Sequence, residues 1–302
     1  MFEGGIEVKI LGVLVKRHML MYLKDKQNVF FSFLSMLIIL ALNTVFLGDV
    51  NIKYLQEFAN IEKAKALYVT NSWLMAGIMI VNAVMISCTM LGIMIKDEED
   101  HKLQGFLVAP ISRFKLVLSY IIAATITAFA FGIATFIFSQ FYILGVGGSL
   151  LSPLRMLAVM GVMLVNIVSS VAMLFCITSF VHTMNSYGAL TTTLGTLIGF
   201  VSAIYLPMGS LPESVQSVLK GFPILYGTAM MRELYTTPAI NTVFEGAPTE
   251  AISLYKEYMG VSITWGDTQM SNGMSLLILL GSAIIFTILA GVIAKKRRIS
   301  DR

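Results

Sequence analysis

The side chains best suited to chemistry gather in one charged stretch, residues 96–115, between two long apolar runs. It opens with an acidic run, Asp97, Glu98, Glu99 and Asp100. Negative charge is favoured where a helix begins, because the first N–H groups of a helix have no acceptor within it. The pattern therefore predicts a short helix that makes electrostatic contacts, and the alternative is a solvated loop between two membrane helices.

The same stretch also carries an apolar stripe. Leu103, Phe106 and Leu107 fall on one face at helical spacing. Pro110 ends the predicted helix because proline has no N–H to continue it. A short helix with this stripe among charges requires a partner surface.

Patterns for catalysis are missing. The sequence has no Gly-Lys dipeptide, which excludes the glycine-rich loop that cradles nucleotide phosphates. The histidines, His18, His101 and His182, are far apart and are expected to be solvated or interfacial. Cys88 and Cys176 have no metal-ligand spacing and are expected to pack within the membrane. We predict no enzyme activity, catalytic residue, metal site or cofactor on this chain.

The composition is that of an integral membrane protein. Of 302 residues, 57% are hydrophobic and 13% charged, whereas soluble domains are about 25% charged. Runs of about 20 apolar residues cross the bilayer as helices. We predict an all-α polytopic protein with one transmembrane domain, 1–302, and six spans, at 29–47, 72–95, 116–145, 156–181, 188–206 and 275–294.

Three other segments complete the predicted topology. Residues 2–27 mix apolar and basic side chains and predict an amphipathic helix on the membrane surface. Residues 207–226 are apolar but too interrupted to span, so we predict a re-entrant helical hairpin. Residues 227–273 form a polar segment on the hairpin's side. The hairpin's breaks and its anchoring tyrosine are Pro207, Pro212, Gly221, Pro223 and Tyr226.

Lysine and arginine set the orientation. The side that holds the N-terminal segment, residues 96–115 and the C-terminal tail carries 14 basic residues, and the other side carries 7. Basic residues concentrate on the cytoplasmic side, so both termini are predicted to be cytoplasmic and the hairpin external. The net charge of +4 then indicates an anionic lipid surface and not nucleic acid.

The spans lack ionisable residues at their centres, which excludes the usual machinery of ion-driven carriers. A transporter with no ion-coupling residue and no ATP site would have to draw its energy from elsewhere, and a separate ATPase subunit fits. Neutral polar residues remain as candidates for a translocation path, with hydrogen bonds between helices as the alternative. They are Asn43, Asn82, Asn166, Thr191, Thr192 and Thr193.

Two stretches resemble one transporter family. The acidic run, the amphipathic turn and Pro110 with Arg113 resemble the cytoplasmic coupling loop of ATP-binding cassette (ABC) type-two permeases, with His101 and Lys102 in place of the usual Gly-Thr. The run 206–232 is similar to that family's external re-entrant hairpin, through Pro223, Tyr226 and Arg232. The resemblance implies that the coupling loop docks on an ABC ATPase. The residues expected to make that contact are Asp97, Glu98, Glu99, Leu103, Phe106, Leu107, Pro110 and Arg113.

The resemblance also implies a function and partners. It implies an exporter permease in the plasma membrane of a bacterium, paired with an identical or homologous permease and with two ATPase subunits that bind ATP and Mg. Gly195 and Gly199 permit close approach of another helix, either from the same subunit or from a second one, and the resemblance places them at the dimer seam. The neutral spans suit an amphipathic or lipophilic cargo, such as a drug, a peptide or a lipid-linked molecule. The alternative is a non-transporting assembly or immunity factor that binds a lipid or peptide.

Overall fold

The computed structural model describes residues 2–42, 52, 55, 61–108, 111–266 and 268–296. These residues form helices apart from one short antiparallel hairpin, so the predicted all-α class is confirmed. The elements are α1 (Phe2–Lys24), α2 (Lys26–Leu42), α4 (Lys63–Glu99), α5 (Lys102–Val108), α6 (Arg113–Gly145), α7 (Pro153–Thr178), α8 (Met184–Val201), η2 (Met208–Ser210), α9 (Glu213–Leu219), α10 (Pro223–Val243), α11 (Thr249–Tyr258), β1 (Thr264–Trp265), β2 (Thr268–Gln269) and α12 (Asn272–Lys296).

Helix α4 is the central element of the fold. It packs against α6, α7, α8, α10 and α2. Its most apolar 18 residues are 83% buried, compared with 22% for α12. The helix begins earlier than the predicted span at 72–95, because Asn71 is held inside it by bonds to Leu67 O (2.8 Å) and from Tyr142 Oη (3.0 Å).

Four of the described helices are long and apolar enough to cross a membrane, namely α4, α6, α7 and α12. The described part of α2 is apolar but shorter. Helix α8 spans 18 residues and is not among the four, since it carries several threonines and glycines. Length and composition in the described residues thus support four of the six predicted spans.

The polar segment predicted at 227–273 is largely structured. Helix α10 starts at Pro223, as the break at Gly221 and Pro223 predicted, but it continues past Tyr226 for 21 residues in all and packs on α4, α7 and α12. Polar residues within α10 lower its mean hydropathy, so the sequence did not predict this helix. Its internal Pro238 leaves the Leu234 carbonyl without a helical donor, and Arg155 Nη1 donates to that carbonyl at 3.3 Å.

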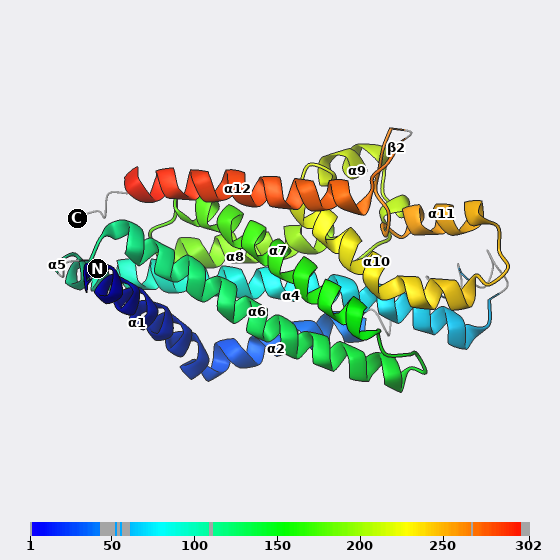
Figure 1. The fold of residues 1–302 in the computed structure, drawn as a ribbon, viewed down its shortest axis with the longest axis horizontal. Coiled ribbons are helices and arrows are strands. Elements are labelled where there is room, and N and C mark those ends of the chain that lie inside the picture. The colour runs from blue at the N-terminus through cyan, green and yellow to red at the C-terminus, as the bar shows by residue number, and fades with distance from the viewer. Residues whose placement is uncertain are drawn as a thin grey trace.

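Different short elements lie at the two ends of the molecule. Figure 1 shows the start of α1, helix α5 and the last turns of α12 at one end, and α9, α11 and the hairpin at the other. Helix α1 lies along α6, with Leu14 and Tyr22 buried and Val13 68% exposed. It ends one residue before Asp25, whose carboxylate accepts the Asn28 N–H at 3.1 Å and so caps α2.

Candidate functional site

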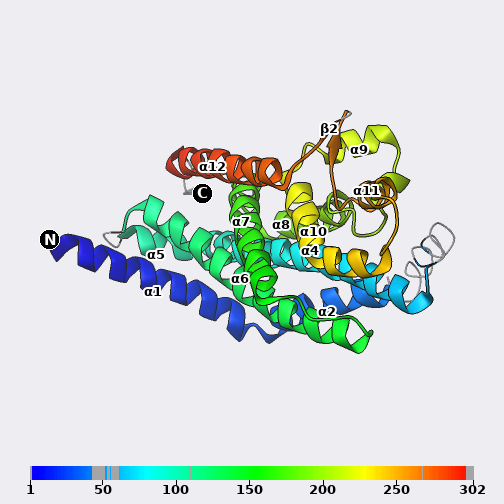
Figure 2. The same ribbon diagram turned by 45° about the vertical axis from the view of Figure 1, so that its right-hand side comes forward.

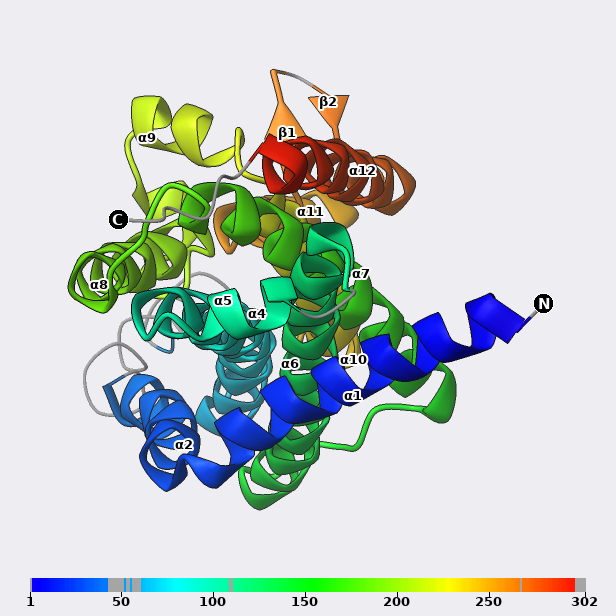
Figure 3. The ribbon, with the colours of Figure 1, turned by 90° about the vertical axis from the view of Figure 1, so that its left-hand side faces the viewer.

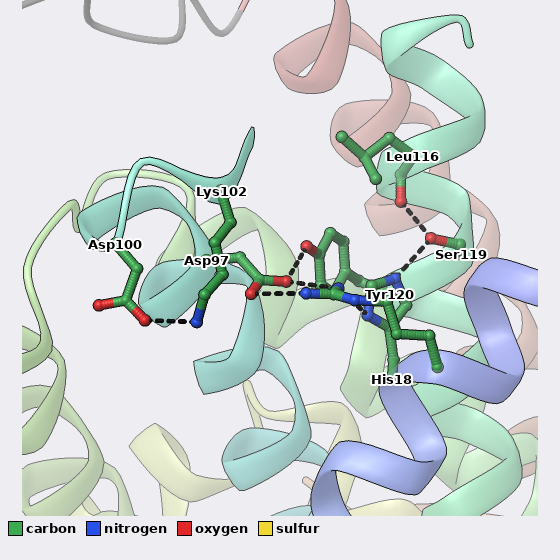
Figure 4. Close-up of polar contacts among 8 residues, drawn as sticks. His18, Asp97, Asp100, Lys102, Leu116, Ser119 and Tyr120 are labelled. Carbon is green, nitrogen blue, oxygen red and sulfur yellow. Dashed lines mark hydrogen bonds and ion pairs between the residues drawn. The ribbon is translucent and has the colours of Figure 1, made fainter. Parts of the chain in front are cut away.

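The prediction that the acidic run begins the short helix is wrong, because the run ends α4 and α5 begins only at Lys102. At this last turn of α4, Asp97 joins three helices. Asp97 is fully buried. Arg17 of α1 donates to both of its carboxylate oxygens, at 2.7 and 3.0 Å, and Tyr120 of α6 donates to Oδ2 at 2.6 Å. Figure 4 shows Asp97 facing Tyr120 from the end of its helix. A bidentate arginine pair fixes both distance and orientation, so α1, α4 and α6 are held in one register here.

His18 extends this contact in a fixed protonation state. Burial, and then the charge of Arg17, lower the pKa of His18 to about 4, so its ring is neutral at pH 7. Arg17 can only donate, so His18 Nδ1 accepts from it at 3.2 Å and the ring proton lies on Nε2. Nε2 then donates to Ser119 Oγ at 2.9 Å, and Ser119 donates to Leu116 O at 2.6 Å. The ring also stacks on Tyr120, with centroids 3.8 Å apart.

The next acidic residues bind the start of α8. Glu98 Oε1 lies 2.8 Å from His182 Nδ1, and Glu99 Oε2 accepts the Met184 N–H at 3.0 Å. That N–H belongs to the first turn of α8, where carboxylates are favoured. Asp100 pairs with Lys102 of α5 at 2.6 Å, and this pair is exposed. The four acids therefore link the end of α4 to α1, α6, α8 and α5, a cluster that we call the acidic hub.

The predicted apolar stripe of α5 packs partly inside the chain itself. Leu103 is 5% exposed, and the Arg17 guanidinium lies over the Phe106 ring at 5.0 Å. The Leu107 side chain and Pro110 lie outside the described residues. The accessible surface of this loop is instead formed by other residues, including Gly105 and the predicted Arg113, with Phe114 48% exposed.

A cavity of about 760 Å³ opens between α1, α4 and α8. Of the predicted path residues, Thr191 and Thr192 line it, and so does Gly195. Three methionines and two charged residues also line it, namely Met21, Met85, Met184, Asp25 and Lys96. Figure 3 shows α8 and α2 apart from each other on the same side of α4.

The other predicted path residues lie elsewhere. Asn82 donates to Thr135 Oγ1 of α6 at 2.9 Å within the bundle. Asn166 is buried without a partner for its amide among the described residues, and it packs so closely on Gly227 that a Cβ there would collide with it. Thr193 is exposed and bonds to its own helix. Asn43 lies outside the described residues.

The glycine pair of α8 contacts its own chain. A Cβ at Gly195 would lie 3.2 Å from Met85, and one at Gly199 would collide with the Tyr205 ring. Tyr205 reaches Gly199 because α8 ends at a left-handed residue, Ala203 with φ 46°. The face that α8 leaves uncovered includes Leu197, which is 52% exposed. The seam assigned to these glycines remains a prediction.

The residues predicted to form the re-entrant hairpin lie at η2, at α9 and at the start of α10. Pro207 and Pro212 precede η2 and α9, and Tyr226 Oη donates to Lys220 O at 2.8 Å and accepts from Trp265 Nε1 at 2.8 Å. Nearby, Arg232 of α10 is fully buried.

Arg232 binds backbone carbonyls and an aromatic ring. Its Nη2 donates to Ser202 O and Ala203 O at 3.0 and 2.8 Å, and its Nη1 donates to Gly260 O at 3.4 Å. Its guanidinium lies 4.2 Å from the Trp73 ring of α4. Among the described residues, no carboxylate forms an ion pair with it. Carbonyls at the ends of α8 and α11 thus take the place of a carboxylate.

The sequence identified the acidic run but not its partners. Arg17 and Tyr120 are 80 and 23 residues away from Asp97, and no spacing rule connects them. The basic side chain of Arg17 in the amphipathic N-terminal segment was a possible sign of an ion pair, but it did not identify Asp97 as the partner. Among the described residues, no group of three or more possible metal ligands comes together.

Comparison with known families gives one match. A family model described as ABC-2 family transporter protein matches residues 39–292. This range runs from the end of α2 to the last turns of α12 and includes the whole acidic hub except its α1 partner. A search of curated proteins finds no match.

Proposed function

Because the chain belongs to the ABC-2 transporter family, we propose that it is the permease subunit of an exporter driven by ATP hydrolysis on a separate ABC ATPase. Membership makes it a membrane transport subunit, which associates with such an ATPase in this family. The proposal adds the direction of transport, the docking site and the nature of the cargo.

The acidic hub is the observation that carries this proposal. It ties the exposed loop around α5 to α1, α6 and α8 through short polar contacts. A push on this loop by a docked subunit would reach α8 through Glu98 and Glu99. It would reach α1 and α6 through Asp97. Contacts of this kind transmit motion only if they are rigid, and the bidentate pair at Asp97 meets that requirement.

The cavity beside α8 supports the class of cargo. Its methionines adapt to irregular apolar shapes, and its threonine hydroxyls, Asp25 and Lys96 offer polar contacts. We infer a path for an amphipathic or lipophilic molecule such as a drug, a peptide or a lipid-linked compound. Its volume of about 760 Å³ is within the range of ordinary ligand sites.

The proposed assembly has six spans per chain, adding α2 and α8 to the four long apolar helices. We propose that both termini and the hub lie on the cytoplasmic side of a bacterial plasma membrane. The re-entrant hairpin of residues 207–226 and helix α11 then lie outside. Exposed apolar side chains on α2 and α8, such as Phe31 at 59% and Phe200 at 47%, support a second permease, identical or homologous, at that face. Two ATPase subunits, which bind ATP and Mg, complete the complex.

A pair of cysteine variants tests the docking site. Gly105 and Gly145 both lie in helices and are exposed, and a Cβ at either would have nothing within 4 Å. They lie at opposite ends of the molecule. A photocrosslinker on Gly105→Cys should join the permease to the ATPase in native membranes, and one on Gly145→Cys should not. Adducts from Gly145→Cys alone would contradict the proposed docking end and favour a different role for the hub.

A further inference from the structure

A small polar cavity lies at the end of the molecule opposite the acidic hub. Its volume is about 340 Å³, and its walls come from α10, α11, the β-hairpin and the start of α12. Figure 2 shows the start of α12 meeting these elements. The cavity is separate from the larger one beside α8 and from the hub, and the export mechanism proposed above does not use it.

The start of α12 lies at this cavity. Ser271 Oγ accepts the Met274 N–H at 3.2 Å, so Ser271 caps the helix. The N–H groups of Asn272 and Gly273 have no acceptor among the described residues. Both Ser271 and Asn272 line the cavity. A long helix that begins this way offers donors and a partial positive charge to an anion.

Two hydroxyl groups in the walls also lack partners. Ser275 is 5% exposed, lines the cavity, and its hydroxyl has no hydrogen bond within the described chain. Ser262 Oγ is fully buried, lines the same cavity, and is likewise unpartnered. Leaving a buried hydroxyl unsatisfied costs about 1–3 kcal/mol. Ser262 carries this cost, whereas the Ser275 hydroxyl is not fully buried and is available to a group bound in the cavity.

The charges in the walls are already balanced. Lys256 Nζ donates to Glu233 Oε1 at 2.9 Å, and Thr237 Oγ1 lies 3.3 Å from the same oxygen. The one carboxylate among the lining residues is therefore neutralised. What remains is the positive end of α12 and the two free hydroxyls, a surplus of donors.

We propose that this cavity binds a phosphate group, either as a free anion or as the headgroup of a phospholipid. The donors are the first N–H groups of α12 and the hydroxyls of Ser262 and Ser275, with Lys256 nearby. The flank of α12 that follows is apolar and exposed, with Leu277 at 69%, so a lipid headgroup can reach the helix start from the bilayer.

Thermal unfolding of the purified permease in an uncharged detergent tests the site. Inorganic phosphate, compared with chloride at equal ionic strength, should raise the unfolding temperature in a saturable way. In Ser275→Ala the half-saturating concentration should rise about tenfold, the factor for one hydrogen bond to a charged group. Ser253→Ala, which removes an exposed hydroxyl on α11 bonded only to its own helix, should behave as wild type.

A second variant separates binding from stability. Asn272→Asp places a carboxylate at the start of α12, which favours the helix but repels phosphate. Its unfolding temperature without phosphate should be at least that of wild type, and its response to phosphate should disappear. An unchanged response in Asn272→Asp, or no response in wild type, would overturn the proposal.

A parallel titration with a phospholipid identifies the source of the phosphate. The same titration is repeated with short-chain phosphatidylglycerol. Half-saturation by the lipid below the concentration needed for inorganic phosphate assigns the site to a headgroup, and the reverse order assigns it to a free anion. Either order supports a phosphate site, whereas stabilisation by the lipid that persists in Asn272→Asp contradicts it.

Discussion

Replacing Arg232 by methionine should lower the free energy of unfolding by about 3 kcal/mol, the largest effect that we expect from a single substitution. The side chain keeps much of its volume but loses every donor. The carbonyls of Ser202, Ala203 and Gly260 would then be left without the bonds that Arg232 supplies. Relief of the buried charge offsets part of this cost, and the figure allows for that.

The loss at Arg232 should also loosen the end of α8. Ala203 holds a left-handed conformation, which costs an alanine about 1–2 kcal/mol, and Arg232 donates to its carbonyl. Thermal unfolding in detergent measures the loss. Arg155→Met is the matched control, because Arg155 also donates to the backbone of α10, but through one bond of 3.3 Å. Equal unfolding temperatures for Arg232→Met and wild type would contradict this role.

Replacing Asp97 by alanine should free α1 from the rest of the bundle. Arg17 and Tyr120 both lose their acceptor, and bonds to a charged group are worth about 2 kcal/mol each. Arg17 is 29% exposed, so it can turn to water, and we expect a net loss of about 2 kcal/mol. The structural consequence is larger, because the bidentate pair is the polar tie between α1 and α4.

Hydrogen exchange measures that release directly. In Asp97→Ala the amides of α1 around Arg17 and His18 should exchange faster, while those in the centre of α4 should not change. Asp100→Ala removes a neighbouring acid whose pair with Lys102 is exposed, and it should leave α1 protected. Faster exchange of α1 in both variants would mean that general charge, and not the Asp97 contact, holds this helix.

The sequence predicted the apolar architecture well and the polar contacts poorly, for physical reasons. Uncharged runs of span length, as in α4, α6, α7 and α12, identify candidate membrane helices, because about 20 apolar residues cover the hydrocarbon of the bilayer. Helix α10 was missed because Arg232, Glu233 and Thr236 reduce its hydropathy, although the first and last of these are buried.

Contacts between residues far apart in the sequence cannot be predicted from local patterns. The acidic run was singled out from its local charge, yet its partner Arg17 is 80 residues away. Leu103 shows a second limit of prediction from sequence. Its spacing predicted an apolar face, but periodicity cannot tell a face that waits for another protein from one that packs on its own chain, as Leu103 does at 5% exposure.

ATP hydrolysis by the copurified ABC ATPase, measured with and without the permease in lipid vesicles, tests the central claim most directly. We expect the wild-type permease to change the hydrolysis rate severalfold. Gly105→Arg should abolish the change, because it adds bulk on the exposed face of α5 where a Cβ meets nothing within 4 Å and so leaves the fold intact. The same hydrolysis rate with wild-type permease, with Gly105→Arg and with no permease would contradict the claim that this chain is driven from the acidic hub.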